Sequence, residues 1–169
     1  MNPTLAQWNG ADEDLAVTAL LSCCAARRWA RALAAERPFD DQSTLYAAAD
    51  AQWAEMEETD WMEAFRAHPR IGERKAAEAS QQSKAWSGQE QAQVHSAQDA
   101  VLTALAEGNR AYEERFGFTY IVCATGKSAE EMLAILNRRL ANDRATELHE
   151  AAEQQRQITQ IRLRKWLAV

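Results

Sequence analysis

The sequence contains three histidines, and His68 is the one best placed for proton transfer. It lies in the run His68-Pro69-Arg70-Ile71-Gly72, where the proline disfavours helical backbone at His68 and the glycine permits a turn. A loop should therefore display this imidazole, whose unperturbed pKa of about 6.5 suits acid/base catalysis. The alternative is a structural role in which His68 caps a helix end or binds a backbone carbonyl.

Four other polar residues have structural explanations beside chemical ones. Ser87-Gly-Gln-Glu90 has the spacing of a capping box, which accounts for Glu90, although a carboxylate in a first turn at a cleft could also act on a substrate. Gln91 is by itself an ordinary surface residue. Arg162 could anchor an anion or lie solvated on a helix, and Cys123 is most simply a core residue.

Metal and nucleotide sites are not expected. His68, His95 and His149 are never three or four residues apart, so they cannot form paired helical metal ligands. No Cys-x-x-Cys motif, Gly-rich phosphate loop or Gly-x-Ser-x-Gly elbow is present. The chemistry of this protein should therefore use its own side chains.

The composition favours a single helical domain that spans residues 1–169. A chain of 169 residues can bury one substantial core, and six glycines and three prolines are too few for a turn-rich β architecture. Apolar residues recur at intervals of three and four over most of the length, as in amphipathic helices. We expect an all-α fold, a compact multi-helix bundle.

The charge, the hydropathy and the cysteines of the chain indicate which partners and which cellular compartment to expect. The net charge is −6 and the basic residues form no stripe, which argues against a nucleic-acid partner. No segment has the roughly 20 apolar residues of a membrane span. Three cysteines, two of them adjacent, cannot all pair within one chain and fit a reducing compartment. We expect a cytoplasmic protein.

Five polar residues mark expected helix starts, and one stretch is expected to be extended. A helical pattern also runs from Ser87 to Gly117, with a break near His95. Phe118–Cys123 has strand-like composition but no partner strand, so it should be a buried extended connection. The expected starts are Asp12, Ser43, Thr59, Ser128 and Thr146.

Three stretches of the sequence form a combined signature. They are Ala64 to Gly72, Trp86 to Gln91, and Asn109 to Phe118 with its continuation from Ile121 to Lys127. Together they resemble the family of OHCU (2-oxo-4-hydroxy-4-carboxy-5-ureidoimidazoline) decarboxylases, in its bacterial stand-alone form. The resemblance covers essentially the whole chain, since Cys23 to Phe39 and Glu153 to Leu163 also fit.

The resemblance implies a helical, cofactor-free homodimer that decarboxylates OHCU, a small molecule, to (S)-allantoin in purine breakdown. It implies His68 and Glu90 as the catalytic pair. It further implies a substrate pocket formed by Pro69, Ser87, Gln91, Arg162 and the backbone around Phe118, Ile121 and Val122.

Three other functions compete with this interpretation. A non-catalytic ligand-binding module could use His68 and Arg162 to hold a small anion. A related enzyme could act on another ring system. A helical interaction domain could present a partner surface of tryptophans in its first half, although we expect those side chains to be mostly core and dimer contacts: Trp8, Trp29, Trp53 and Trp61.

Overall fold

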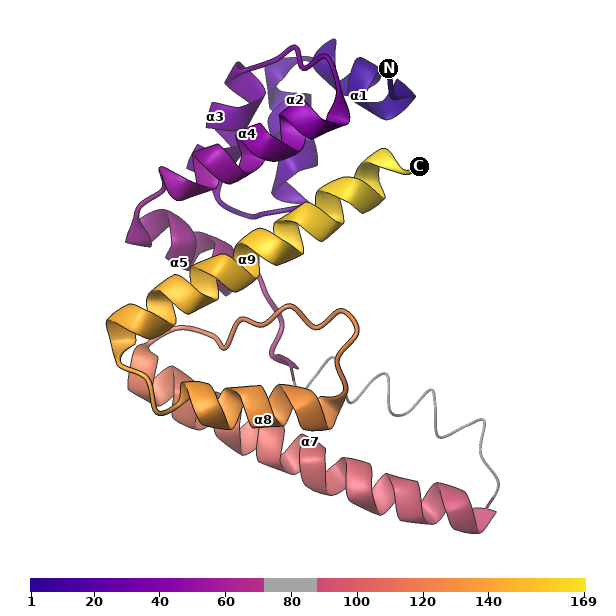
Figure 1. The fold of residues 1–169 in the computed structure, drawn as a ribbon, viewed down its shortest axis with the longest axis vertical. Helices are drawn as coiled ribbons and strands as arrows, with labels where there is room; N and C mark the ends of the chain where they lie inside the picture. Colours follow the sequence, from indigo (N-terminus) through magenta and orange to yellow (C-terminus); the bar gives the residue numbers. More distant parts are fainter. Residues whose placement is uncertain (72–87) are drawn as a thin grey trace. The chain divides into compact units, whose positions relative to one another are not determined.

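The structure is a computed structural model that describes residues 1–71 and 88–169, without the side chains of residues 88–96. Every regular element in these two ranges is an α-helix and neither contains a strand, which confirms the all-α prediction. The helices, shown in Figure 1, are α1 (Pro3–Asn9), α2 (Glu13–Leu21), α3 (Arg27–Ala35), α4 (Gln42–Ala54), α5 (Glu58–Arg66), α7 (Gly88–Phe116), α8 (Ala129–Arg139) and α9 (Arg144–Leu167).

The chain packs as two units. Unit 1 comprises Met1–Ala67 and Ala152–Val169, and unit 2 comprises His68–Ala151. Helix α9 therefore contributes its first residues to unit 2 and the rest to unit 1. That residues 1–169 form one domain stays a prediction.

Aspartates, and not the expected hydroxyl residues, cap two of the helices. Asp41 accepts a hydrogen bond from the backbone N–H of Thr44 at 2.8 Å, so α4 begins before Ser43. Asp143 accepts one from the backbone N–H of Thr146 at 2.7 Å, which places Thr146 inside the first turn of α9. These hydrogen bonds lower the pKa of both aspartates, and a carboxylate also interacts favourably with the helix dipole.

Three further details differ from expectation. Helix α1 was not predicted, although Asn2 accepts a hydrogen bond from the N–H of Leu5 at 3.0 Å and Pro3 occupies the first helical position, where its missing N–H costs nothing. Helix α5 begins one residue before Thr59. Helix α7 is continuous through His95, so the expected break is absent.

Two predicted starts and the extended connection are confirmed. Asp12 directly precedes α2, and the Ser128 hydroxyl accepts a hydrogen bond from the N–H of Glu131 at 3.1 Å at the start of α8. Phe118–Cys123 is neither helix nor strand, and most of its residues are buried.

Three tryptophans form the framework of the unit 1 core. Trp8, Trp29 and Trp53 are at most 6% exposed, and each indole N–H donates to a backbone carbonyl of another segment. Such bonds satisfy the one polar atom of a large apolar side chain. These three tryptophans are core residues, as expected, whereas Trp61 is half-buried. The acceptors are the carbonyls of Ala16, Ala49 and Ala152, at 2.9, 3.0 and 2.9 Å.

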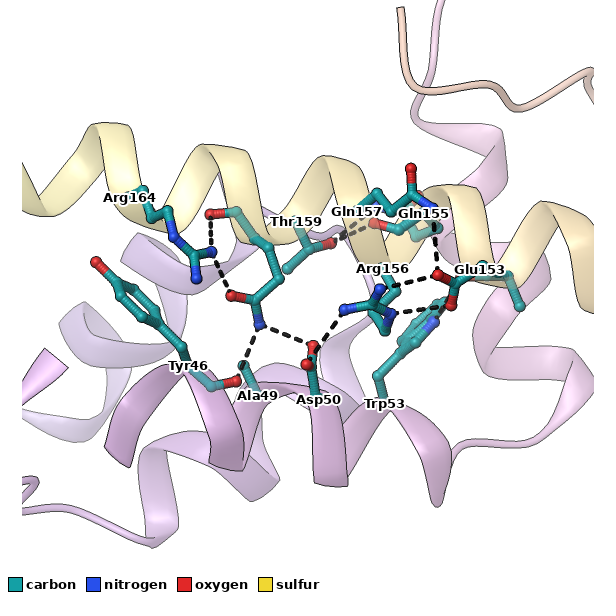
Figure 2. Close-up of polar contacts among 12 residues, drawn as sticks. Tyr46, Ala49, Asp50, Trp53, Glu153, Gln155, Arg156, Gln157, Thr159 and Arg164 are labelled. Carbon is teal, nitrogen blue, oxygen red and sulfur yellow. Dashed lines mark hydrogen bonds and ion pairs between the residues drawn. The ribbon is translucent and has the colours of Figure 1, made fainter. Parts of the chain in front are cut away.

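Polar side chains also join α4 to the unit 1 part of α9 (Figure 2). The Gln160 amide donates to the Tyr46 carbonyl at 2.9 Å and to the Asp50 carboxylate at 2.7 Å. Arg156 donates to the other oxygen of Asp50 at 3.2 Å and pairs with Glu153 one turn away at 2.8 Å. These contacts fix the register of α9 against α4.

A buried ion pair lies at the centre of unit 2. Arg139 and Glu147 have side chains only 4% and 0% exposed, and their closest nitrogen and oxygen are 2.9 Å apart. The Arg139 guanidinium also donates to the Ile121 carbonyl at 2.7 Å, and the Asn142 amide donates to Glu147 at 3.0 Å. Burial by itself would lower the pKa of Arg139, but the hydrogen bonds and charge of Glu147 and the neighbouring Tyr112 and Tyr120 together outweigh burial and raise it. Arg139 therefore stays charged.

Aromatic rings surround this ion pair. The Tyr112 hydroxyl donates a short hydrogen bond to Glu147, and the Arg139 guanidinium lies 5.0 Å from the ring centroid of Tyr120. Burial and the neighbouring Glu147 raise the pKa of Tyr112 far above its usual value. The phenol thus remains a hydrogen-bond donor.

Helices α7 and α8 approach each other closely at a glycine. A Cβ atom at Gly108 would lie 2.5 Å from Cδ2 of Leu136, a fully buried side chain of α8. Only the absence of a side chain at Gly108 permits this contact. The backbone of α7 at Gly108 therefore packs directly against the Leu136 side chain of α8.

The described residues contain neither a membrane-crossing helix nor a metal-binding cluster. No helix there combines the length and apolarity that crossing a bilayer requires. The same residues bring together no group of three or more His, Cys, Asp or Glu side chains with metal-binding geometry.

We predict that Glu147→Gln lowers the free energy of unfolding by about 3–5 kcal/mol, because it leaves the Arg139 charge buried without a counter-ion. Glu153→Gln, in the half-exposed pair with Arg156, should cost about 1 kcal/mol or less. Urea denaturation of both variants measures the difference. Equal losses would mean that the buried pair has no special weight.

Candidate active site

The histidine lies in a short connection, as predicted. Helix α5 ends at Arg66, and His68-Pro69-Arg70 follows without helical structure. His68 is half-buried, whereas Pro69 and Arg70 are exposed. Arg70 binds Glu113 of α7 through two hydrogen bonds, Nε to Oε1 at 2.9 Å and Nη2 to Oε2 at 3.1 Å. The loop that carries the imidazole is therefore attached to α7 by a paired, charge-assisted contact.

The extended connection is held from several sides. Phe118, Ile121 and Val122 are at most 5% exposed. The Ile121 carbonyl accepts from Arg139, and the Tyr120 hydroxyl donates to the carbonyl of Met132 in α8 at 3.0 Å. The side chains of the connection are thus packed inward, and its backbone has a fixed position.

Two backbone amides of this connection have no hydrogen-bond acceptor within the described part of the chain. Among the described residues, no acceptor forms a hydrogen bond with the N–H of Ile121 or of Val122, although both residues are only 2% exposed. Buried backbone N–H groups are nearly always paired in folded proteins. Unpaired donors in a fixed, buried backbone are suited to bind carbonyl or carboxylate oxygens of a ligand.

Arg162 lies half-buried on α9, in unit 1. Its Nη1 donates to the Cys23 carbonyl at 3.3 Å, beyond the end of α2. No described carboxylate forms an ion pair with it, in contrast to Arg139 and Arg156. A guanidinium held by a backbone carbonyl keeps most of its donors for an anion, so the structure supports Arg162 as a candidate anion anchor.

The adjacent cysteines are unsuited to nucleophilic chemistry. Burial raises the pKa of Cys23 to about 11 and that of Cys24 to about 12, despite the nearby positive charge of Arg162. Both thiols stay protonated near neutral pH, and the thiolate is the reactive form. Cys123 is also a free, buried cysteine. All three behave as core residues, in agreement with the sequence-based interpretation.

The comparisons with known proteins point to one family. The model of the OHCU decarboxylase family matches residues 9–164, almost the whole chain. The chain belongs to the OHCU decarboxylase family. The chain is 27% identical over 165 residues to the 2-oxo-4-hydroxy-4-carboxy-5-ureidoimidazoline decarboxylase of Haloferax volcanii. The match covers 95% of the chain and 94% of the relative.

A longer relative and one solved structure agree with this assignment, and a second solved structure shares the fold. The chain is 35% identical over 144 residues to the uric acid degradation bifunctional protein TTL of Arabidopsis thaliana; this covers 85% of the chain but only 44% of that protein. A crystal structure of OHCU decarboxylase in the presence of (S)-allantoin superposes with a TM-score of 0.73 at 29% identity, covering 94% and 100% of the two chains. An (S)-allantoin synthase, at 20% identity and a TM-score of 0.70, shares the fold; 96% of the chain matches 53% of it.

Part of the site predicted for this OHCU decarboxylase family member lies outside the described residues. Ser87 is not described, and Glu90 and Gln91 are placed only by their backbone, in the first turn of α7. The structure brings Phe118, Ile121 and Val122 together in one held segment of unit 2, the unit that also contains His68. The complete constellation stays a prediction.

Sequence reasoning missed the residues that hold the site elements. Arg139, Glu147, Tyr112 and the Arg70–Glu113 pair were not singled out. A signal for Arg139 was present, because it follows Met132 and Leu136 at helical spacing on the buried face of α8. A charged residue in an apolar stripe predicts a buried ion pair, but the stripe does not identify the partner.

Proposed function

We propose that this protein catalyses the cofactor-independent decarboxylation of OHCU to (S)-allantoin, in the breakdown of urate. The observation that carries the proposal is the match of residues 9–164 to the OHCU decarboxylase family. The full-length similarity to the decarboxylase of Haloferax volcanii supports it. The amides of Ile121 and Val122, which have no acceptor in residues 1–71 and 88–169, fit a polar, oxygen-rich ligand of this kind.

The substrate contains its own electron sink, which is why a protein without a cofactor can act on it. The ring carbon that bears the hydroxyl and the carboxylate lies next to a ring C=N bond. When the bond to CO2 breaks, its electron pair forms a C=C bond with the former imine carbon, and the imine nitrogen takes up a proton. The resulting enol becomes a carbonyl as a proton is delivered to one face of the former imine carbon. The enzyme must align the carboxylate and select the face.

His68 and Glu90 are assigned to proton transfer. His68 would act at the hydroxyl and carboxylate end of the substrate as acid/base and orienting donor. Glu90, in the first turn of α7, would pair with the imidazole and fix its tautomer. The positive end of the helix stabilises a carboxylate at this position.

The remaining side chains are assigned to binding. Arg162 would hold the carboxylate or a carbonyl oxygen with its planar guanidinium. The N–H groups of Ile121 and Val122 would donate to the ring or ureido oxygens, beside the apolar surface of Phe118. The residues assigned to the ureido and ring amides and to the wall of the pocket are Ser87, Gln91 and Pro69.

The setting of the enzyme is also a proposal. We infer a stand-alone, bacterial-type decarboxylase that works in the cytoplasm as a homodimer. The support is the resemblance described above, the net charge of −6 and the reduced, buried cysteines.

We predict that His68→Asn lowers kcat by roughly 10²–10⁴-fold, the usual contribution of a positioned proton-transfer group. The assay generates OHCU from urate with urate oxidase and 5-hydroxyisourate hydrolase, and follows the optical activity of the product by circular dichroism. His149→Asn is the matched control, because His149 is exposed on α9 and should not affect turnover.

The wild-type protein decides between the two main functions in the same assay. A fast, optically active product supports the decarboxylase. A folded protein that leaves the product racemic at the spontaneous rate would instead indicate a non-catalytic ligand-binding module.

We expect Arg162→Lys to raise KM for OHCU roughly ten- to hundredfold, because a hydrogen bond to a charged group is worth about 1.5–3 kcal/mol and lysine cannot form the planar pair. Arg164→Lys, two residues further along α9 on an exposed position, should leave KM unchanged. Steady-state kinetics compares the two. An unchanged KM in Arg162→Lys would remove this residue from the site.

Sedimentation velocity at working concentration should give the mass of two chains. A species of about 19.0 kDa, the mass of one chain, at the concentration used for the assay would contradict the homodimer.

A further inference from the structure

The pair formed by Arg70 and Glu113 differs from an ordinary surface contact in its geometry. Two N–H groups of one guanidinium meet the two oxygens of one carboxylate, at 2.9 and 3.1 Å. This arrangement restricts orientation as well as distance, because both groups are planar. It joins the histidine loop to α7, which are far apart in sequence but both part of unit 2.

The α7 side of this contact is rigid. Glu113 directly follows Tyr112, which is fully buried and hydrogen-bonded to Glu147. One turn later Phe116 is also buried, and its ring centroid is 4.6 Å from that of Tyr112. Glu113 therefore projects from a helix segment whose own position is fixed by the unit 2 core.

The loop side transmits this restraint to the histidine. Only Pro69 separates Arg70 from His68, and the proline ring fixes one backbone dihedral of that short span. With the Arg70 guanidinium held and the proline φ fixed, the His68 backbone has a smaller range of positions open to it than in a loop without this contact. The position of the imidazole is thus coupled to the carboxylate of Glu113.

The ion pair between Arg70 and Glu113 contributes little to the stability of the fold. Arg70 is 56% and Glu113 28% exposed, and ion pairs at such sites shift the folding equilibrium by only about fivefold or less. By contrast, a displacement of about 1 Å in a reacting group can lower the rate roughly 10²-fold. The contact therefore has far more influence on chemistry than on folding if His68 takes part in the reaction.

We propose that Glu113 is a positioning residue of the decarboxylase: through its two hydrogen bonds to Arg70 it holds the His68 loop in the geometry that proton transfer requires. This inference rests on the proposed function, because it needs His68 to act on the substrate. It assigns no contact between Glu113 and the substrate.

The test is a set of variants assayed by circular dichroism on OHCU generated in place. Glu113→Gln should lower kcat roughly 10- to 100-fold and change KM by less than about threefold, since the binding groups are untouched. The charge-reversed double variant Arg70→Glu with Glu113→Arg should recover most of the lost kcat, which a loss of packing would not permit.

The matched control is Glu63→Gln. Glu63 forms an ion pair with Arg27 at 2.7 Å, with 22% and 68% exposure, so the two pairs are alike in length and accessibility. Glu63→Gln should change the melting temperature by about as much as Glu113→Gln does, but should keep wild-type kcat. Equal losses of kcat in Glu63→Gln and Glu113→Gln would overturn the proposal, as would wild-type kcat in Glu113→Gln.

A double variant separates this inference from the proposed function. If Glu113 acts through His68, Glu113→Gln will lower kcat in the wild-type background but cause no further loss in a His68→Asn background. Independent, multiplying losses would overturn the positioning role and leave the catalytic role of His68 standing. Full activity of His68→Asn alone would overturn the assignment of His68, and the positioning role with it.

Discussion

The buried ion pair between Arg139 and Glu147 is the interaction on which the organisation of unit 2 depends. A charge without a counter-ion is too costly in this core, so α8 and the start of α9 must meet wherever these two side chains meet. Arg139 then uses a further donor on the Ile121 carbonyl. A connection without secondary structure thereby acquires a defined backbone. The amides of Ile121 and Val122, for which the described residues provide no acceptor, are held in place by the same fixed backbone.

The candidate site follows a common division of labour. Two of the groups proposed to act on the substrate, His68 and the amide of Val122, lie on irregular segments, whereas Glu90 and Arg162 lie on helices. The groups that restrain these irregular segments belong to helices: Glu113 to α7 and Arg139 to α8. Helical scaffolds hold such restraints at fixed spacing, whereas loops give reacting groups access. Precision in this protein therefore comes from residues that never need to touch the substrate.

The sequence allowed prediction of the helical class, several helix starts and the extended connection, because these depend on local patterns. The predicted starts of α4 and α9 were wrong, because Asp41 and Asp143 cap these helices in place of Ser43 and Thr146. The sequence did not reveal the pairing of Arg139 with Glu147 or of Arg70 with Glu113. Those contacts depend on which helix faces which, and amphipathic spacing says that a face is buried without saying by what.

The aromatic residues are distributed unevenly between the two units, and this has an optical consequence. Trp8, Trp29, Trp53, Trp61 and Trp166 all belong to unit 1, whereas the described part of unit 2 contains Tyr112 and Tyr120 but no tryptophan. Because Trp86 falls within residues 68–151, indole emission of a Trp86→Phe variant would report on unit 1 alone. Far-ultraviolet ellipticity reports on helices in both. Superimposable transitions from the two signals would mark one cooperative folding unit, and separate transitions would mark two.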